Sequence, residues 1–389
     1  MAERIRGGNE EKSMKVLVAG AGIGGLCLAQ GLVRAGIDVR VFEREPGADS
    51  RYQGFRIGLD GPGLAALREC LPPRLHRLLE AVTGPLAGER RVVDPWLNEF
   101  RQLSATVDGT AADRHVLRQL LLAGLGDRVE FGRAVIGYRE RADGRAEARL
   151  ADGGSAVGDL LVGADGVGSA VRRQLLPGAE VTAVPGNALL GRTPLTERLA
   201  ALVPGSGTLV HGPDLNLLIG RMEFRRPPRL AAAELAPEVE LPDSESYLRW
   251  VAMLPEPLGP EAGTWAQVRD RLLDRIDGWH PDLVELVRDS DTGNSSPLTI
   301  RYAEPVSHWG TGPVTLLGDA VHAMPPSAGQ GANTALRDAA QLCRSLTAVH
   351  RGEAGLTAAV EEYELLMLDR GFAAVAMGLD RLQEFTPAR

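Results

Sequence analysis

The sequence predicts an α/β fold in which three separated pieces of chain build one parallel sheet and a sheet-rich segment is inserted between them. Three observations carry this prediction. An apolar strand at Lys15–Ala19 runs through a glycine-rich turn into a segment with helical apolar spacing, Ile23–Ala35. Two further apolar strands, Asp159–Val162 and Val314–Leu317, each run into a turn of Gly and Asp. Residues 180–300 alternate strand-like stretches with proline-rich loops.

The first turn has the spacing G-x-G-x-x-G, with glycines at Gly20, Gly22 and Gly25. In such a turn the main chain approaches a pyrophosphate closely, and the helix that begins at Ile23 points its unpaired N–H groups at the phosphate charge. The turn therefore predicts a bound dinucleotide. The alternative is a strand–helix–strand unit that binds no ligand, since a lone motif of this kind is a weak signal.

An acidic residue supports the dinucleotide prediction. Glu43 directly follows a second strand, Asp38–Phe42, and lies 23 residues beyond Gly20. At this distance a carboxylate accepts hydrogen bonds from a ribose of the nucleotide. An acid at this position favours FAD or NAD over the phosphorylated NADP.

Composition and charge exclude several classes of protein. The chain has 389 residues, 44% of them hydrophobic, and a net charge of −8, which gives no reason to expect nucleic acid or an anionic membrane as a partner. No apolar run approaches the roughly 20 residues that span a bilayer. Cys27, Cys70 and Cys343 are scattered and form neither a metal-ligand pattern nor a disulfide framework. We expect a cytoplasmic protein whose polar lead-in, residues 1–13, is disordered.

Three motifs occur in an order that resembles the class A, single-component FAD-dependent aromatic monooxygenases with the para-hydroxybenzoate hydroxylase-like fold. These motifs are Gly20–Gly25 with Glu43, Asp165-Gly166 with Ser169 and Arg172, and Leu317–Ala320. The segment Gly318–Asn333 is similar to the tetracycline-degrading monooxygenases in particular. The resemblance covers most of residues 14–345. It implies a Rossmann-like FAD-binding domain of the GR2 type, an inserted sheet-rich substrate domain and a C-terminal helix.

The resemblance assigns each part of the chain to a domain. It implies a discontinuous FAD-binding domain and a substrate-binding domain threaded through it. The FAD-binding domain is expected at 14–90, 105–180 and 300–350, the substrate-binding domain at 91–104 and 181–299, and a C-terminal helical segment at 351–389.

The same resemblance implies the residues that bind FAD. Asp319 would accept a hydrogen bond from the ribityl chain, and the helix that begins near Gly331 would point at the N1/C2 edge of the flavin. Three of these roles have structural alternatives, because Asp319 could cap a helix or a turn, and Arg51 and Arg114 could be solvated surface arginines. The full expected set is Gly20, Gly22, Ile23, Gly25, Glu43, Arg44, Arg51, Arg114, Asp165, Gly166, Gly318, Asp319, Pro326, Gly329, Gly331, Ala332 and Asn333.

The implied reaction needs no catalytic side chain. NAD(P)H would reduce FAD, O2 would form a C4a-hydroperoxyflavin, and its distal oxygen would hydroxylate or epoxidise an aromatic or polycyclic small molecule such as a natural product or antibiotic. The sequence contains no Ser–His–Asp order, paired carboxylates or metal spacing, which fits a cofactor enzyme. His322 is expected to pack or hydrogen-bond beneath the flavin loop. We expect a monomer or homodimer without nucleic-acid or integral membrane partners.

The substrate pocket is expected between the flavin and the sheet of the insert. Its candidate wall residues are Asn187, Leu189, Leu209, His211, Asn216, Leu218, Gly220, Met222 and Pro325. Side chains alternate along a strand, and the sequence leaves open which alternation faces the flavin.

Two other functions remain open at this point. One is an FAD-dependent reductase or dehydrogenase of the same fold, which oxygen dependence would distinguish. The other is a non-catalytic flavin-containing protein that binds a ligand without turnover. A flavin-dependent halogenase is not expected, because the sequence lacks the W-x-W-x-I-P segment of that group.

Overall fold

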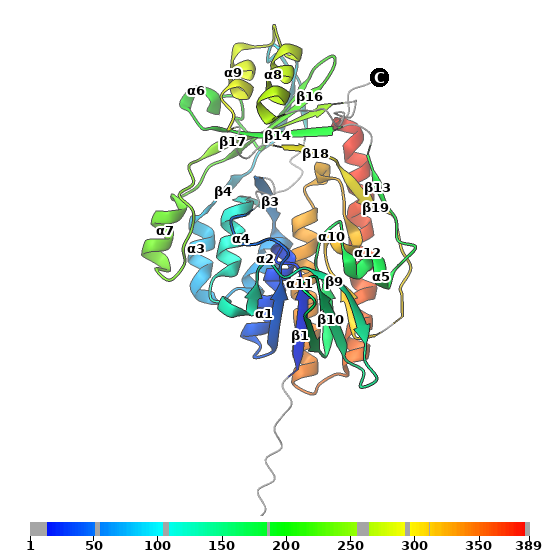
Figure 1. The fold of residues 1–389 in the computed structure, drawn as a ribbon. Helices are drawn as coiled ribbons and strands as arrows, with labels where there is room; N and C mark the ends of the chain where they lie inside the picture. Colours follow the sequence, from blue (N-terminus) through cyan, green and yellow to red (C-terminus); the bar gives the residue numbers. More distant parts are fainter. Residues whose placement is uncertain are drawn as a thin grey trace, which may run out of the picture.

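A computed structural model describes residues 14–50, 55–103, 109–184, 187–254, 264–291, 296–310 and 312–385. It contains a larger part with a parallel sheet and a smaller sheet-rich part, which lies at the top of Figure 1. None of the helices in these ranges is both long and apolar enough to cross a membrane.

The central sheet of the larger part is parallel and is built from three distant pieces of chain, as predicted. Its order is β20-β12-β1-β2-β8. The strands are β1 (Lys15–Ala19), β2 (Asp38–Phe42), β8 (Val129–Glu130), β12 (Leu160–Gly163) and β20 (Val314–Leu316). Because β1, β12 and β20 are parallel neighbours, their carboxyl ends meet at one edge of the sheet.

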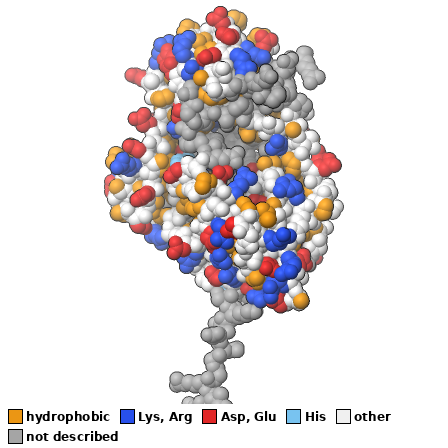
Figure 2. Space-filling view, viewed as in Figure 1, with side chains coloured by type: hydrophobic (Ala, Val, Ile, Leu, Met, Phe, Trp, Pro, Cys, Tyr) orange, Lys and Arg blue, Asp and Glu red, His pale blue; other side chains and the backbone are white. Residues whose placement is uncertain are grey.

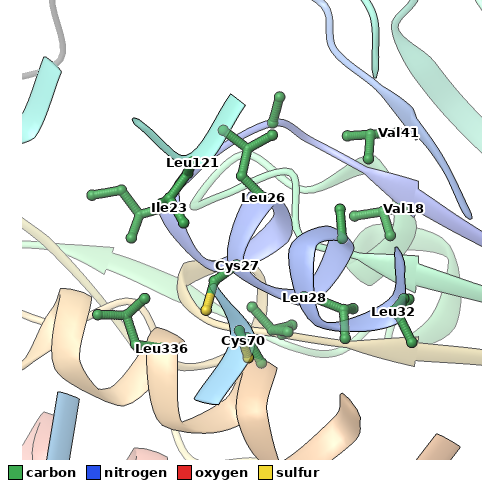
Figure 3. Packing of buried hydrophobic residues seen from close by; sticks show 14 of the residues in the cluster. Val18, Ile23, Leu26, Cys27, Leu28, Leu32, Val41, Cys70, Leu121 and Leu336 are labelled. Carbon is green, nitrogen blue, oxygen red and sulfur yellow. The ribbon is translucent and has the colours of Figure 1, made fainter. Parts of the chain in front are cut away.

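Helix α1 (Ile23–Arg34) packs between the sheet and α11 (Gly331–His350), and Figure 3 shows its apolar side chains among those of Val18, Val41 and Leu336. It begins after Gly22 and ends before Gly36, whose φ of 78° is the left-handed conformation expected after a helix. At Gly31 an added Cβ would lie 2.6 Å from the Sγ of Cys343 and 3.2 Å from that of Cys70.

The three cysteines, distant in the sequence, therefore converge where α1, α2 and α11 meet. All three are free thiols. A hydrogen bond with Cys27 and then burial raise the pKa of Cys70, and a hydrogen bond with Cys70 and then burial raise that of Cys343, so both thiols stay protonated and behave as apolar packing groups.

The smaller part contains a seven-stranded sheet with the order β18-β14-β17-β16-β15-β5-β6. Its strands are β5 (Arg90–Val93), β6 (Glu99–Leu103), β14 (Asn187–Pro194), β15 (Gly207–His211), β16 (Asn216–Met222), β17 (Tyr247–Leu254) and β18 (Ser296–Leu298). Strands of 91–104 and 181–299 thus share one sheet, although the division of the chain into two functional domains stays a prediction.

Helices cover one face of this sheet. Side chains of α8 (Trp265–Arg275) and α9 (Pro281–Arg288) form one apolar cluster with Trp250 of β17, and both helices lie above the sheet in Figure 1. The sequence predicted strand-like stretches within residues 180–300 but not these helices. It also treated Pro227-Pro228 as part of a loop, whereas Pro228 is the first residue of α7 (Pro228–Leu235), where proline's missing N–H costs nothing.

The remaining elements connect or cover these two sheets. An antiparallel sheet of β3 (Arg56–Asp60), β7 (Gly109–Asp113) and β4 (Thr83–Leu86) lies between them. A second small sheet contains β9 (Val135–Glu140), β10 (Ala146–Leu150) and β11 (Ser155–Gly158), and β13 (Val181–Ala183) pairs with β19 (Arg301–Ala303). The other helices are α2 (Gly61–Cys70), η1 (Pro73–Leu75), α3 (His76–Ala81), α4 (Arg114–Leu122), η2 (Gly126–Arg128), α5 (Ala170–Leu175), α6 (Glu197–Ala200), α10 (Asp319–His322), η3 (Pro326–Ala328) and α12 (Leu356–Phe385).

Helix α12 lies within the C-terminal segment 351–389 that was expected to be helical, and it contacts β20, α10, α11 and η3. Its Tyr363 is fully buried, and the Tyr363 hydroxyl donates a hydrogen bond of 2.8 Å to the carbonyl oxygen of Leu316. Burial raises the pKa of Tyr363 well above its ordinary value, so the hydroxyl stays protonated and donates.

We expect Tyr363→Phe to lower the free energy of unfolding by about 1–2 kcal/mol, because it removes a buried hydrogen bond that α12 donates to β20, an edge strand of the central sheet. Urea denaturation followed by circular dichroism measures the change. Tyr302→Phe is the matched control, since the half-buried Tyr302 has no hydroxyl partner among the described residues. Equal stability of both variants and the native protein would show that the bond contributes nothing.

Candidate cofactor and active site

The first glycine turn contains two glycines that the protein's own packing requires. Gly20 has a φ of 103°, and an added Cβ there would lie 2.4 Å from the carbonyl oxygen of Ala164. A Cβ on Gly25 would lie 2.2 Å from the carbonyl oxygen of Gly20. Gly22 differs, because its φ of −76° suits any residue and no atom lies within 4 Å of an added Cβ. The space beside Gly22, at the start of α1, is therefore left for a ligand.

Glu43 braces this turn. Its side chain is 7% exposed, its Oε2 accepts from the N–H of Ala21 at 2.7 Å, and its Oε1 accepts from the N–H of Glu45 at 3.0 Å. Each carboxylate oxygen keeps a further lone pair that could accept from a ribose hydroxyl. The neighbouring Arg44 is exposed and its Nε lies 3.6 Å from a carboxylate oxygen of Glu45.

Sequence reasoning missed Arg118 of α4, which also holds the first turn. Its Nε donates to the carbonyl oxygen of Ala21 at 2.9 Å, and its Nη1 donates to the carbonyl oxygen of Ala48. Arg118 lies four residues after Arg114 and therefore on the same face of the helix, which is the signal that could have found it.

The second turn follows β12 and contains an orphaned acceptor. Asp165 Oδ2 accepts from the N–H of Ala170 at 2.7 Å, whereas its Oδ1 is buried with no hydrogen-bond partner in the described structure. Gly166 has a φ of 74° and open space around it. Arg172 joins this turn to the third, because its guanidinium donates to the carbonyl oxygens of Val167 and Ala320 at 2.9 and 2.8 Å.

The third turn follows β20 and presents an exposed carboxylate. Gly318 takes a φ of 64°, and the side chain of Asp319, the first residue of α10, has no hydrogen-bond partner among the described residues. Asp319 Oδ1 lies 4.0 Å from where a Cβ on Gly331 would be. Burial lowers the pKa of Arg114, and the charge of Asp319 opposes that shift, which places the two groups near each other. The structure thus brings α4, the third turn and the start of α11 together.

A buried charge network holds the third turn in place. Asp338 of α11 accepts at Oδ2 from the N–H of Gly318 at 3.2 Å and from His322 Nε2 at 2.6 Å, and at Oδ1 from Arg370 at 2.8 Å. Burial lowers the pKa of His322, but the charge and hydrogen bond of Asp338 outweigh burial and raise it. Burial raises the pKa of Asp338, and its cationic partners outweigh that and lower it. His322 therefore hydrogen-bonds beneath the loop, as predicted.

The loop before α11 leaves three N–H groups free. Gly329 has a φ of 66° and ends η3, and α11 then begins at Gly331 without a side-chain cap. No described residue accepts from the N–H of Gly331, Ala332 or Asn333, so the positive end of a 20-residue helix points away from the rest of the protein. Pro326 is exposed beside it, whereas Pro325 is buried and lies 3.2 Å from where a Cβ on Gly378 would be.

The side chain of Asn333 is fully used by the protein. Its Nδ2 donates to the carbonyl oxygens of Gly58 and Gly329 at 3.0 and 3.1 Å, and its Oδ1 accepts from the N–H of Asp60 at 3.1 Å. Only its main-chain N–H remains for a ligand. Asn333 is thus a positioning residue that ties the start of α11 to β3.

The expected pocket residues divide between the two faces of the seven-stranded sheet. Leu209, Leu218 and Gly220 lie on the face toward β3, where Met222 is buried in the core of the larger part. His211 and Asn216 lie on the same face, and His211 Nδ1 lies 3.0 Å from Asn216 Oδ1.

One pocket prediction needs correction. Leu189 packs in the cluster of α8 and α9, on the opposite face, because strand alternation places it beside Trp250. Pro325 is buried and packs against α12, and its role in the pocket stays a prediction. The side chain of Asn187 and the whole of Arg51 lie outside the described residues.

No group of three or more His, Cys, Asp or Glu side chains in the described ranges could hold a metal ion. The features that the structure does provide fit a dinucleotide. They are the space at Gly22, the unpartnered oxygen of Asp165, the free carboxylate of Asp319 and the uncapped start of α11. All lie at the carboxyl edge of the parallel sheet, where ligands of such folds bind.

Comparison with known proteins identifies the family. A family model described as "FAD binding domain" matches residues 114–365, and one described as "NAD(P)-binding Rossmann-like domain" matches residues 18–58. The chain belongs to the FAD-binding family of the first model, and its relatives are FAD-dependent monooxygenases, a class of oxidoreductases. The predicted Rossmann-like α/β fold is confirmed, and the family model supports the predicted FAD cofactor.

Two curated relatives are similar over most of this chain. The dual O-methyltransferase/FAD-dependent monooxygenase elcB of Phaeosphaeria nodorum is 34% identical over 85% of this chain and 40% of its own length. The aurachin C monooxygenase/isomerase of Stigmatella aurantiaca is 31% identical over 93% of this chain and 87% of its own. The chain spans less than half the length of the first relatives it matches, from Phaeosphaeria and Cercospora.

Solved structures agree on the fold. A Photorhabdus luminescens protein assigned as an FAD-containing monooxygenase has a TM-score of 0.82 and 32% identity, over 96% of this chain and 98% of its own. The tetracycline destructase Tet(51) has a TM-score of 0.66 and 21% identity, over 96% of this chain and 92% of its own. The expected resemblance to that branch is therefore confirmed for the fold.

A pair of glycine variants tests the site. We expect Gly22→Ala to melt at the same temperature as the native protein without FAD but to bind FAD about tenfold more weakly or worse, because its methyl group enters the ligand's space. Gly25→Ala should instead lower the melting temperature without FAD, since its methyl group meets main chain. Calorimetry and FAD titration measure both; undiminished FAD affinity in Gly22→Ala would contradict this location.

The His322–Asp338 pair predicts a pH dependence of stability. The folded pKa of His322 is raised, so its contribution is complete below the unfolded value of about 6.5 and is lost as the pH rises through the folded pKa. The melting-temperature difference between the native protein and His322→Gln should therefore be largest below about pH 6.5 and shrink at higher pH. The exposed His350→Gln is the control; a difference independent of pH would mean that His322 is neutral.

Proposed function

We propose that the protein is a flavin monooxygenase that uses NAD(P)H and O2 to hydroxylate or epoxidise an aromatic or polycyclic small molecule. The observation that carries the proposal is the convergence of three strand-end turns and the uncapped α11 at one edge of the sheet, in a chain whose relatives are FAD-dependent monooxygenases. NAD(P)H, O2 and the small molecule are the proposed partners, and a cytoplasmic location is consistent with three free thiols.

The residues that would hold FAD follow from the three turns. Gly22 and the first N–H groups of α1 would bind the pyrophosphate, and Glu43 a ribose. Asp319 and the unpartnered Oδ1 of Asp165 would accept from hydroxyl groups of the bound molecule. Arg114, which has no hydrogen-bond partner in the described part of the chain, would donate to a phosphate or ribose. When bound, FAD would supply the redox chemistry that takes electrons from NAD(P)H and activates O2.

The protein's own groups would supply electrostatics and water exclusion. The free N–H groups of Gly331, Ala332 and Asn333 would stabilise negative charge at the flavin through the positive end of α11. Asp338, through the N–H of Gly318, holds the turn that positions Asp319. The face of the sheet that contains Leu209, Leu218 and Met222 would form an apolar wall that keeps water from the reacting atoms.

An aromatic or polycyclic substrate is supported by the name of the aurachin C monooxygenase/isomerase, which is 31% identical. It is also supported by the apolar sheet face opposite the flavin edge. The choice between NADH and NADPH concerns a co-substrate that binds and then dissociates, so it depends on residues other than those of the three FAD-binding turns.

Labelled oxygen tests the proposal. The FAD-loaded protein is incubated with NADPH or NADH, ¹⁸O2 and a panel of phenols, quinolones and polycyclic ketones, and the products are analysed by mass spectrometry. We expect a product with one labelled oxygen atom and consumption of NAD(P)H that the substrate stimulates. Asp319→Asn should bind FAD about tenfold more weakly, since a charge-assisted hydrogen bond contributes roughly 1.5–3 kcal/mol.

The alternatives give different results. A reductase would yield product that gains hydrogen without labelled oxygen, and a binding protein would protect its ligand without changing the ligand's mass. A control in labelled water with ordinary O2 shows that the oxygen comes from O2. Colourless protein that cannot be reconstituted with FAD would contradict the proposal as a whole.

A further inference from the structure

Two arginine side chains from different sheets meet over one glycine of the sheet face described above. Arg56 belongs to β3 and Arg249 to β17. A Cβ added at Gly220 of β16 would lie 2.6 Å from Arg56 Nη1 and 3.6 Å from Arg249 Nη2. Gly220 therefore provides the room in which the two guanidinium groups approach each other.

A third arginine extends this cationic cluster. Arg90 of β5 is buried, and its Nε lies 3.5 Å from where a Cβ on Gly207 would be. Gly207 belongs to β15, which pairs with both β5 and β16. Strand alternation places Arg90 and Arg249 on the same face, so the cluster of Arg56, Arg90 and Arg249 lies on the face that looks toward β3.

The charges of Arg56 and Arg249 are not neutralised by the described residues. The Nε atoms of both are buried without a hydrogen-bond partner, and Arg56 Nη2 reaches only the carbonyl oxygen of Ser206 at 3.5 Å. Burial and then the charge of Arg249 lower the pKa of Arg56 to about 9. Burial and then the charge of Arg90 lower that of Arg249 to about 10. Both groups are still cationic at neutral pH.

The acids nearby have other partners. Asp113 accepts from the Tyr247 hydroxyl at 2.7 Å and from the N–H of Val116 at 2.9 Å. Asp291 pairs with Arg192 at 3.1 Å. Among the described groups that shift the pKa of Arg56 or Arg249, only Tyr247 opposes the lowering, and no carboxylate does.

A buried cation without an opposite charge destabilises a fold, so its presence indicates that a group beyond the described residues supplies the charge. Arg192 contrasts with these two arginines, because its charge is balanced within the chain by an ion pair with Asp291. Arg56 and Arg249 instead keep part of their surface accessible while lying deep between the two sheets, as residues that line a cavity do.

The cationic cluster lies beside the proposed flavin site. Arg56 is two residues before Gly58 on β3, a separation of about 7 Å along an extended strand. The carbonyl oxygen of Gly58 accepts from Asn333, the third residue of α11. Leu218 lies on the same sheet face, two residues from Gly220, so an apolar surface adjoins the charges.

We propose that Arg56 and Arg249 bind a carboxylate of the substrate, so that this protein acts on aromatic acids. This inference rests on the proposed function and specifies its substrate class. A guanidinium group matches the two oxygens of a carboxylate with paired N–H donors, and the unpartnered Nε atoms leave such pairs available. The acid would be held at the sheet while its ring lies against the apolar surface next to α11.

Paired probes test this without turnover. The FAD-loaded protein is titrated by calorimetry with benzoate, salicylate and 2-naphthoate, and with the neutral amide of each. We expect each acid that binds to do so about tenfold more tightly than its amide, since only the acid neutralises the cluster. Arg56→Gln and Arg249→Gln should lose this preference, and Gly220→Ala, which displaces Arg56 without changing charge, should reduce it.

Thermal stability separates a binding role from a structural one. Because Arg249→Gln removes a like charge from the cluster, we expect it to raise the melting temperature without substrate while it weakens acid binding. Arg221→Gln is the matched control, because Arg221 lies next to Gly220 on the opposite face of β16 and its Nε is 3.4 Å from Glu223. It should change neither property.

The outcomes are distinguishable from failure of the proposed function. Loss of FAD binding would contradict the flavin site itself, and it would be detected before any titration with an acid. With FAD bound, equal affinity for acids and amides, no saturable binding of any acid, or full acid preference in Arg249→Gln would each overturn the carboxylate site. Preference for the phenol of salicylate over its carboxylate, seen as equal binding of salicylate and salicylamide, would also overturn it.

Discussion

The structure depends on one geometric constraint: the carboxyl ends of β1, β12 and β20 lie side by side in a parallel sheet, so the turns that follow them must share one edge. Each turn is made mainly by main chain, and its key glycines, Gly20, Gly166 and Gly318, have positive φ. Main-chain N–H groups and short acids can then face the same ligand. A long dinucleotide can be bound by pieces of chain that are hundreds of residues apart only because the sheet brings their ends together.

Two buried clusters of charge adjoin this edge, and they differ in what balances them. Asp338 lies among His322, Arg370 and the N–H of Gly318, so its charge is balanced within the chain. Such a network is expensive to break and therefore fixes the turn that carries Asp319. Arg56 and Arg249 repel each other across Gly220 and have no acid among the described groups that act on them. The first arrangement stabilises the fold, and the second is suited to a ligand.

Much of the fold could be predicted from the sequence because local signals agreed with the global pattern. The strand Lys15–Ala19 has the predicted bounds, and the helix Leu356–Phe385 lies within the segment expected to be helical, since apolar periodicity and a flanking glycine or proline marked them. Helices α8 and α9 were missed because they are short and lie among prolines, and their apolar side chains pack on the sheet that they cover. Leu189 was listed as a candidate wall residue but lies on the other face, because a period of two identifies two faces without identifying which one meets the rest of the protein.

The sequence could predict those residues of the candidate site that lie close together in short sequence motifs. Glycine turns followed by acids are such signals, and Glu43, Asp165 and Asp319 were predicted as site residues from them. Arg56, Arg90 and Arg249 carry no such signal. They lie on three strands separated by up to 193 positions in the sequence. The pairing of β15 with β5 and β16, and of β16 with β17, makes Arg90 and Arg249 neighbours, and Arg56 of β3 meets Arg249 over Gly220.

The link between these two groups of residues is itself structural. The side chain of Asn333 hydrogen-bonds with Gly58, Asp60 and Gly329, so it ties the start of α11 to the strand that contains Arg56. A carboxylate held by Arg56 would therefore be positioned relative to the same helix end that faces the flavin. Because the strand and the helix are rigid, this link would hold the ring of a bound acid at a fixed distance from the start of α11.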